Sequence, residues 1–196
     1  MKKRFGLATF ALVVALPLVA GTASARNDDE QATEFDVHVG DAFLFGRGVP
    51  LLSDVAQASN GDTIEVLFTG RIDTEDGEAA GTGDFQHFDK SGKVVEFGTF
   101  RATRLISFTD FGLAGLPPPF PATSHGGTSM IAVRAVAYPA SNPGQSSRFE
   151  ATLQVDCRLG NFPLGFTEGI HFAVTGGLNF NVKVSGMNLY VAQRED

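Results

Sequence analysis

The chain has little of several residue types that define common classes of protein. It contains one cysteine, no tryptophan, and 15 lysine and arginine residues against 22 aspartate and glutamate residues. A single cysteine excludes an intramolecular disulfide framework. The net charge of −7 makes nucleic acid and anionic membranes poor partners, because both select basic surfaces. Hydrophobic residues nevertheless make up 43% of the chain, which argues against wholesale disorder and for a folded core.

The sequence motifs of common catalytic and cofactor sites are also missing. There is no H-E-x-x-H, no H-x-H and no pair of cysteines, so the histidines form no zinc signature. His87, Asp89 and Glu96 have part of the spacing of a metal-binding strand, but Asp89 stands where a second histidine is needed. No G-x-S-x-G indicates a nucleophile elbow. We therefore predict no metal and no organic cofactor, and no catalytic residue is indicated.

The one long hydrophobic run lies at the N-terminus. Basic residues at 2–4 precede an apolar run over 5–20, and Ala23-Ser24-Ala25 provides a small-residue cleavage site. That order is typical of a secretory signal peptide over 1–25, cleaved near Ala25. The run has about 16 residues, fewer than the roughly 20 that cross a bilayer, which favours cleavage over anchoring. The predicted location is therefore the periplasm or the medium.

The rest of the chain is predicted to form one domain. Residues 26–34 are rich in aspartate and glutamate and are interpreted as an acidic flexible segment. Residues 35–196 have the length of a single domain that can bury a sizeable core. No second stretch approaches the length of a membrane span, so no stable membrane insertion is expected.

Alternation of apolar and polar side chains predicts β-structure through most of this domain. The clearest case is 149–158, where Phe149, Leu153 and Val155 share one face and polar residues share the other. A period of two with one polar face is typical of an antiparallel strand covered on one side. Further predicted strands are 35–45, 63–72, 79–89, 93–109, 129–138, 168–175 and 178–191. We expect one short helix, around Leu51–Ala58, and a long irregular segment over 110–128.

Several of the predicted strands are long and contain internal glycines, namely Gly83, Gly98 and Gly186. Glycine weakens a strand unless the sheet bends there or two backbones approach closely. Long, bent antiparallel strands favour an all-β fold with a single antiparallel barrel of about eight strands. A β-sandwich is the alternative.

Charged residues interrupt the apolar alternation of three predicted strands. Glu96 and Arg104 share the alternation of apolar residues in 93–109, and Arg134 and Glu168 do so in their own strands. A charge on a buried face is costly unless it is paired or lies in a wetted cavity. The candidate ligand-binding residues are therefore Glu96, Arg104, Arg134, Tyr138 and Glu168. Alternatively, β-bulges shift the alternation and place these charges in solvent, and Gly98 makes a bulge easy.

Two stretches carry a resemblance to known families. Gly81-Thr82-Gly83-Asp84-Phe85, followed by Val94 to Phe100, resembles β-barrel proteins of the allene oxide cyclase and dirigent type. The part from Glu168 to Gly186 is similar to a group of uncharacterised small secreted proteins. The resemblance covers 62–191 and implies an eight-stranded barrel that can form homo-oligomers. It also implies a cavity for a hydrophobic small molecule, which in the plant families undergoes cyclisation or radical coupling without a cofactor. No functional residue of those families matches a position here.

Three functions remain open from the sequence. The first is binding of a small, largely apolar ligand in the barrel interior. The second is a cofactor-free isomerase or cyclase that works in the same cavity. The third is a structural or partner-binding envelope protein that uses the surface of the barrel.

Overall fold

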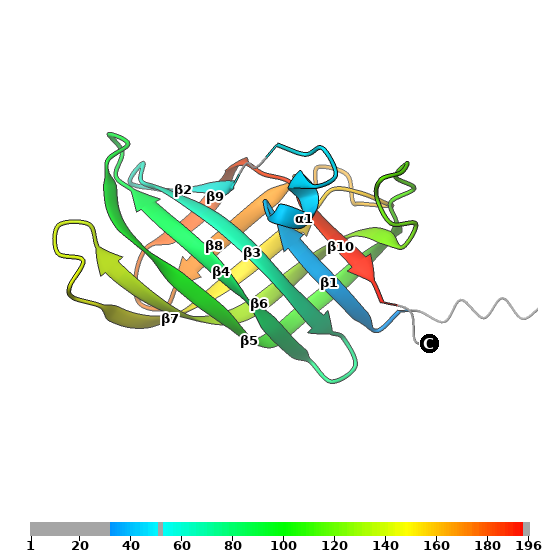
Figure 1. Cartoon of the computed structure of the whole chain (residues 1–196), viewed down its shortest axis with the longest axis horizontal. Helices are drawn as coiled ribbons and strands as arrows, with labels where there is room; N and C mark the ends of the chain where they lie inside the picture. Colours follow the sequence, from blue (N-terminus) through cyan, green and yellow to red (C-terminus); the bar gives the residue numbers. More distant parts are fainter. Residues whose placement is uncertain (1–31, 51–52, 194–196) are drawn as a thin grey trace, which may run out of the picture. The chain divides into compact units, whose positions relative to one another are not determined.

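Ten β-strands and one short helix make up the part of the chain that the computed structural model describes, residues 32–50 and 53–193. The elements are β1 (Glu34–Val39), α1 (Ala42–Phe45), β2 (Asp54–Ala58), β3 (Thr63–Asp73), β4 (Glu78–Phe88), β5 (Val94–Leu113), β6 (Ser124–Pro139), β7 (Ser147–Cys157), β8 (Gly169–Val174), β9 (Asn179–Ser185) and β10 (Asn188–Ala192) (Figure 1). The predicted signal peptide over 1–25 and most of the acidic segment over 26–34 lie outside the described residues.

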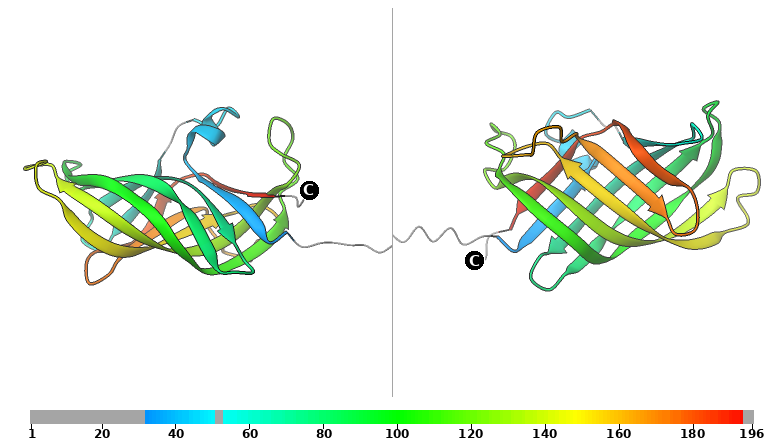
Figure 2. Two further views of the ribbon diagram at one scale, coloured as in Figure 1. Left: turned by 60° about the horizontal axis from the view of Figure 1, so that its bottom comes forward. Right: turned by 180° about the vertical axis from the view of Figure 1, so that it is seen from behind.

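All ten strands belong to one antiparallel sheet whose pairings close into a ring. The first part of β3 pairs with β2 and the second part with β1, so β1 and β2 share one position in the ring. In the same way β9 pairs with β2 while β10 pairs with β1, so β9 and β10 share the next position. The ten strands thus fill eight positions. From β2 to β9 each strand pairs with the next one in the sequence, the β2–β9 pairing closes the ring, and β10 lies between β1 and β6. Figure 1 and the rear view in Figure 2 show β3, β4 and β5 on one side of the ring and β7, β8 and β9 on the other.

The all-β class and the single antiparallel sheet are confirmed, but the strand predicted over 178–191 is divided into β9 and β10, and another predicted strand is shorter than expected. The strand predicted over 35–45 ends at Val39, because Gly40 has φ +53° and Asp41 begins a helix. The Asp41 side chain accepts a hydrogen bond from the backbone N–H of Leu44 (3.1 Å), which caps α1. The helix therefore lies at Ala42–Phe45.

The helix predicted around Leu51–Ala58 is wrong. Residues 54–58 form strand β2, and residues 51–52 lie outside the described part of the chain. Asp54, Ala56 and Ala58 are buried and alternate with half-buried residues. That is the period of a strand, and it is carried by small residues that give little periodic signal in the sequence.

The loop predicted over 110–128 is shorter than expected, because the β5–β6 ladder continues into it. β5 extends to Leu113 and β6 begins at Ser124, with Leu113 opposite His125. The register of this ladder shifts between Ala102 and Arg104 and again between Leu105 and Ser107. These β-bulges bend the long strand and reset which side chains face inward.

Inward-facing side chains fill the interior of the ring. Aromatic ring centroids lie 5.8 Å apart for Phe68–Phe100, 5.7 Å for Phe100–Phe172, 6.2 Å for Phe85–Phe172, 4.8 Å for Phe35–Phe108 and 5.0 Å for Phe108–Tyr190. Two internal glycines make room for these rings. A Cβ on Gly83 would lie 2.2 Å from the Phe100 ring, and one on Gly98 would lie 2.8 Å from the Phe85 ring. The interior is therefore a packed aromatic core.

A second, smaller apolar layer covers the outer face of β1 and β10. Leu44 of α1 packs there with Leu189 and Val191 of β10, and all three are buried. Leu116 and Phe120 of the proline-rich segment between β5 and β6 complete this layer. That segment therefore lies against the outer side of the ring wall at β10.

Replacing Phe172 by alanine tests the packed interior. The Phe172 side chain is fully buried between Phe85 and Phe100, so Phe172→Ala should lower the free energy of unfolding by about 3–5 kcal/mol. Chemical denaturation followed by fluorescence or circular dichroism measures this loss. Phe45→Ala is the matched control, because Phe45 is 56% exposed and should change stability by about 0.5 kcal/mol or less. Equal stability of the two variants would contradict a packed core.

Candidate functional site

The structure disperses the five residues that the sequence analysis singled out. Arg104 and Arg134 are exposed on the outer face of the ring, and Tyr138 stacks on the partly exposed Phe97 (5.9 Å) near the end of β6. Of the two interpretations that the sequence left open for Arg104 and Arg134, an inward charge and a solvent-facing one, the structure shows the solvent-facing one. The bulge after Ala102 turns Arg104 outward.

In β6 the side chains that face inward are those at the positions that alternate with Arg134, and not those that share its alternation. Ile131, Val133 and Ala135 are buried, and Arg134 alternates with them and is exposed. Arg134 and the β6 residues at every second position from it form the outer face, so Arg134 is not a buried charge. Of the predicted residues, only Glu96 and Glu168 lie in half-buried polar clusters.

Glu96 belongs to an ion-pair cluster around His87. His87 Nδ1 lies 3.4 Å from Glu96 Oε1, and His87 Nε2 lies 3.2 Å from Asp62 Oδ2. The hydrogen bond to Glu96, followed by that to Asp62, raises the pKa of His87 above its ordinary value, against the effect of burial. Asp89 instead accepts backbone N–H groups of its own turn, such as that of Ser91 (2.8 Å). Over residues 32–50 and 53–193, no three or more His, Cys, Asp or Glu side chains gather in a way that could hold a metal ion.

Glu168, which is half-buried, forms an acid pair with the buried Asp54 at the break between β9 and β10. Asp54 Oδ1 accepts the backbone N–H of Met187 (2.8 Å), and Glu168 Oε1 accepts the backbone N–H of the next residue, Asn188 (2.7 Å). Glu168 Oε2 also accepts the backbone N–H of Arg158. Two successive amides at the break thus hold carboxyl groups from two distant parts of the chain.

Gly186 makes space for this pair. A Cβ at position 186 would lie 2.1 Å from the Asp54 carboxyl group, so any side chain there would collide with it. The internal glycine that suggested a bend in the sequence is therefore explained by a close approach of a buried acid.

Burial raises the pKa of both acids to about 7. The negative charge of Asp54 raises the pKa of Glu168 further, whereas its backbone hydrogen bonds and Lys183 lower it. Asp54 Oδ2 and Asn188 Oδ1 are both buried without a hydrogen-bond partner in the described structure, and the two side chains are neighbours. These two oxygen atoms are sealed from solvent, so they do not face a substrate.

Sequence reasoning missed a buried ion pair beside these acids. Lys183 Nζ lies 2.6 Å from Asp156 Oδ2, which is fully buried, and it donates to the backbone carbonyl of Thr167 (2.6 Å). The Thr128 hydroxyl also donates to Asp156. In the sequence, Lys183 alternates with Asn179 and Asn181 on the polar face of 178–191, which predicts a solvent-facing side chain. A register shift in the β2–β9 ladder instead accompanies its turn toward Asp156. No spacing in the sequence indicates that the two residues meet.

An open pocket lies at one end of the ring interior and is called the mouth pocket here. Its volume is about 300 Å³. The lining residues are Ala32, Thr33, Phe35, Thr74, Glu75, Phe108 and Asp110. Phe35 and Phe108 are inward-facing rings of the aromatic core and form its apolar floor, while Glu75 and Asp110 supply carboxylates at its rim.

A histidine–aspartate pair adjoins the mouth pocket. His125 Nδ1 lies 2.9 Å from Asp110 Oδ1, and the His125 ring packs edge-on against Phe35 at 5.4 Å. Asp110 also accepts the backbone N–H of Gly112 (2.8 Å), which fixes the carboxylate. An imidazole oriented by a fixed carboxylate is an arrangement that can accept or donate a proton.

Comparison with known proteins gives no relative from which a function could be carried over. The chain matches no protein-family model, no curated protein and no solved structure. The resemblance to allene oxide cyclase and dirigent proteins therefore stays a prediction. Among the described residues, no helix has the length and apolar character that a membrane span requires.

The acid pair predicts a pH dependence of stability that Asp54→Asn should reduce. Because the folded protein binds the Asp54 proton more tightly than the unfolded chain, this contribution is complete below about pH 3.8. It is lost as the pH rises through about 7. A shift from 3.8 to about 7 corresponds to at most about 4 kcal/mol. The free energy of unfolding of Asp54→Asn should therefore fall less than that of wild type between pH 4 and pH 8.

Denaturant titrations across this pH range measure the effect. Asp76→Asn, in the exposed β3–β4 turn, is the control for loss of a carboxylate at the surface. The same pH slope for Asp54→Asn and wild type would contradict a buried acid with a raised pKa.

Proposed function

We propose that the protein binds a small, largely apolar molecule at the open end of the ring interior. The observation that supports this is the mouth pocket, where Phe35 and Phe108 of the aromatic core line an open cavity. Its volume of about 300 Å³ is at the lower end for ligand pockets, which favours a small ligand. The mouths of β-barrels are a common place for such sites. The signal peptide predicted over 1–25 would deliver the protein to the periplasm or the medium.

The rim of the mouth pocket selects the polar part of the ligand. Asp110 and Glu75 offer carboxylate oxygens, and the Thr74 hydroxyl is already used as a donor to the Thr33 carbonyl (3.0 Å). A ligand that places an N–H or O–H group against this rim would gain a charge-assisted hydrogen bond. The proposed ligand is therefore an apolar body with one hydrogen-bond donor.

This proposal differs from the sequence expectation in where the ligand lies. The sequence suggested the middle of the barrel, but Phe68, Phe100 and Phe172 fill that region. Binding in the middle would require these rings to move, whereas the mouth pocket is already open.

N-phenyl-1-naphthylamine is a suitable probe, because it is apolar, carries one N–H group and fluoresces in apolar surroundings. We expect saturable binding with a fluorescence increase and a 1:1 ratio. Thr33→Phe should fill the pocket and weaken binding at least roughly tenfold, since the ligand loses its space there. Thr109→Phe is the control, because Thr109 is exposed and next to Asp110 but does not line the pocket. Absence of saturable binding, or equal binding by both variants, would refute the site.

The Asp110–His125 pair favours a second candidate function, a cofactor-free isomerase that moves a proton on the bound ligand. Native mass spectrometry of the protein from its own host identifies a retained ligand. Incubating that ligand with the protein in D₂O then separates the two functions. A binding protein returns the ligand unchanged, whereas an isomerase exchanges hydrogen for deuterium at carbon, and His125→Gln stops the exchange.

A further inference from the structure

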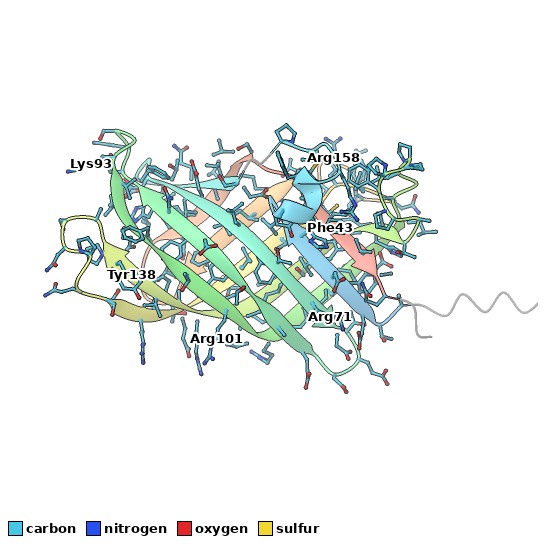
Figure 3. All side chains as sticks on the ribbon, in the orientation of Figure 1. Phe43, Arg71, Lys93, Arg101, Tyr138 and Arg158 are labelled. Atoms are coloured by element: carbon cyan, nitrogen blue, oxygen red, sulfur yellow. The ribbon has the colours of Figure 1, made fainter. Side chains whose placement is uncertain are left out.

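A groove of about 920 Å³ crosses β4, β5, β6 and β7. Its lining consists of the exposed or half-exposed residues Thr82, Asp84, Thr99, Arg101, Arg134, Val136, Arg148 and Glu150, together with Gly83, Phe100, Ala135 and Phe149. The pairing of these strands aligns one row of its lining residues, Thr82, Arg101, Arg134 and Glu150. Arg148 lies in the adjacent row on β7. Figure 3 shows Arg101 on the outer side of β5. Three arginines thus line one surface groove, called the arginine groove here, which is separate from the mouth pocket.

Two of these arginines oppose each other directly. Arg101 is the cross-strand partner of Arg134 in the β5–β6 ladder. Like charges at directly opposite positions destabilise a sheet, so local stability does not explain this pair. Arg134 lies 3.3 Å from Glu150, but both side chains are more than 60% exposed, so solvent screens that contact.

The other arginines of the groove have no such partner. Within the described ranges, no carboxylate oxygen lies within 4.0 Å of the guanidinium group of Arg101 or Arg148. Arg71, by contrast, lies 3.4 Å from Glu34 and 3.2 Å from Asp36. The groove therefore holds three arginines against two carboxylates, Asp84 and Glu150, in a chain that has 22 acidic and 15 basic residues.

We propose that the arginine groove binds a small oxyanion that carries at least two negative charges. The planar guanidinium group offers paired N–H donors that match the oxygens of a phosphate or a carboxylate. Two opposed guanidinium groups and a third in the next row suit an anion with more than one charged group. Asp84 on β4 and Glu150 on β7 stand at the two sides of the groove and would repel a longer polyanion that extends beyond it.

Isothermal titration calorimetry with pyrophosphate and, separately, with citrate tests this proposal. Wild type should bind at least one of them in a 1:1 ratio, more weakly as sodium chloride is added. The anion that binds shows whether the groove prefers phosphate or carboxylate groups. Arg101→Gln/Arg134→Gln should weaken binding at least about tenfold, because two charge-assisted contacts are lost.

Three controls keep the result specific. Arg71→Gln should bind as wild type does, since its charge is matched outside the groove. Thr33→Phe should also bind the anion normally, which separates this site from the mouth pocket. The melting temperature of the double variant should be unchanged or higher, because repulsion between Arg101 and Arg134 is removed.

Several outcomes would overturn the proposal. They are no binding of either anion by wild type, equal binding by the double variant, or equal loss in Arg71→Gln. Sedimentation of both proteins supplies a further test. A wild-type dimer that dissociates in Arg101→Gln/Arg134→Gln would assign the groove to a second copy of the chain instead.

Discussion

Closure of the sheet around a core of phenylalanine rings is the constraint on which the rest of this structure depends. Eight strand positions enclose an interior in which Phe68, Phe85, Phe100 and Phe172 contact one another. Gly83 leaves the space that the Phe100 ring occupies, because a Cβ there would lie 2.2 Å from that ring. A sheet that must bend this sharply also needs bulges, and the long β5–β6 ladder contains several register shifts.

Because apolar side chains fill the interior of the ring, the charged and polar groups of this protein lie outside that core. Charges cannot be accommodated between the rings without partners, and the structure places them in three other settings. Arg101 and Arg134 project from the outer face, Asp110 and His125 lie at one open end, and Asp54 and Glu168 lie at a break in the wall. The remaining charges include the His87 cluster and the Lys183–Asp156 pair, which are matched by their own partners. The accessible settings are the outer face and the open end, so a ligand is expected there and not in the middle of the ring.

The break between β9 and β10 shows how the ring tolerates buried acids. At the break, the backbone N–H groups of Met187 and Asn188 donate to Asp54 and Glu168. Gly186 leaves the space that the Asp54 carboxyl group occupies. Burial then favours the protonated acids, which raises the pKa of Asp54 and Glu168 to about 7. The wall is therefore closed at this point by groups whose charge changes near neutral pH.

The sequence by itself determined the β class, the antiparallel pairing and most strand positions, because strict alternation as in 149–158 has no other stable solution. It also pointed to Glu168 as a polar residue in unusual surroundings. Only the tertiary structure decided which face is buried where a strand contains a bulge, as Arg104 and Lys183 show, since a bulge reverses the facing of the side chains up to the next one. It likewise decided that Asp54 meets Glu168 and that Arg101 opposes Arg134. These neighbours are set by strand register and ring closure, which depend on contacts between residues far apart in the chain.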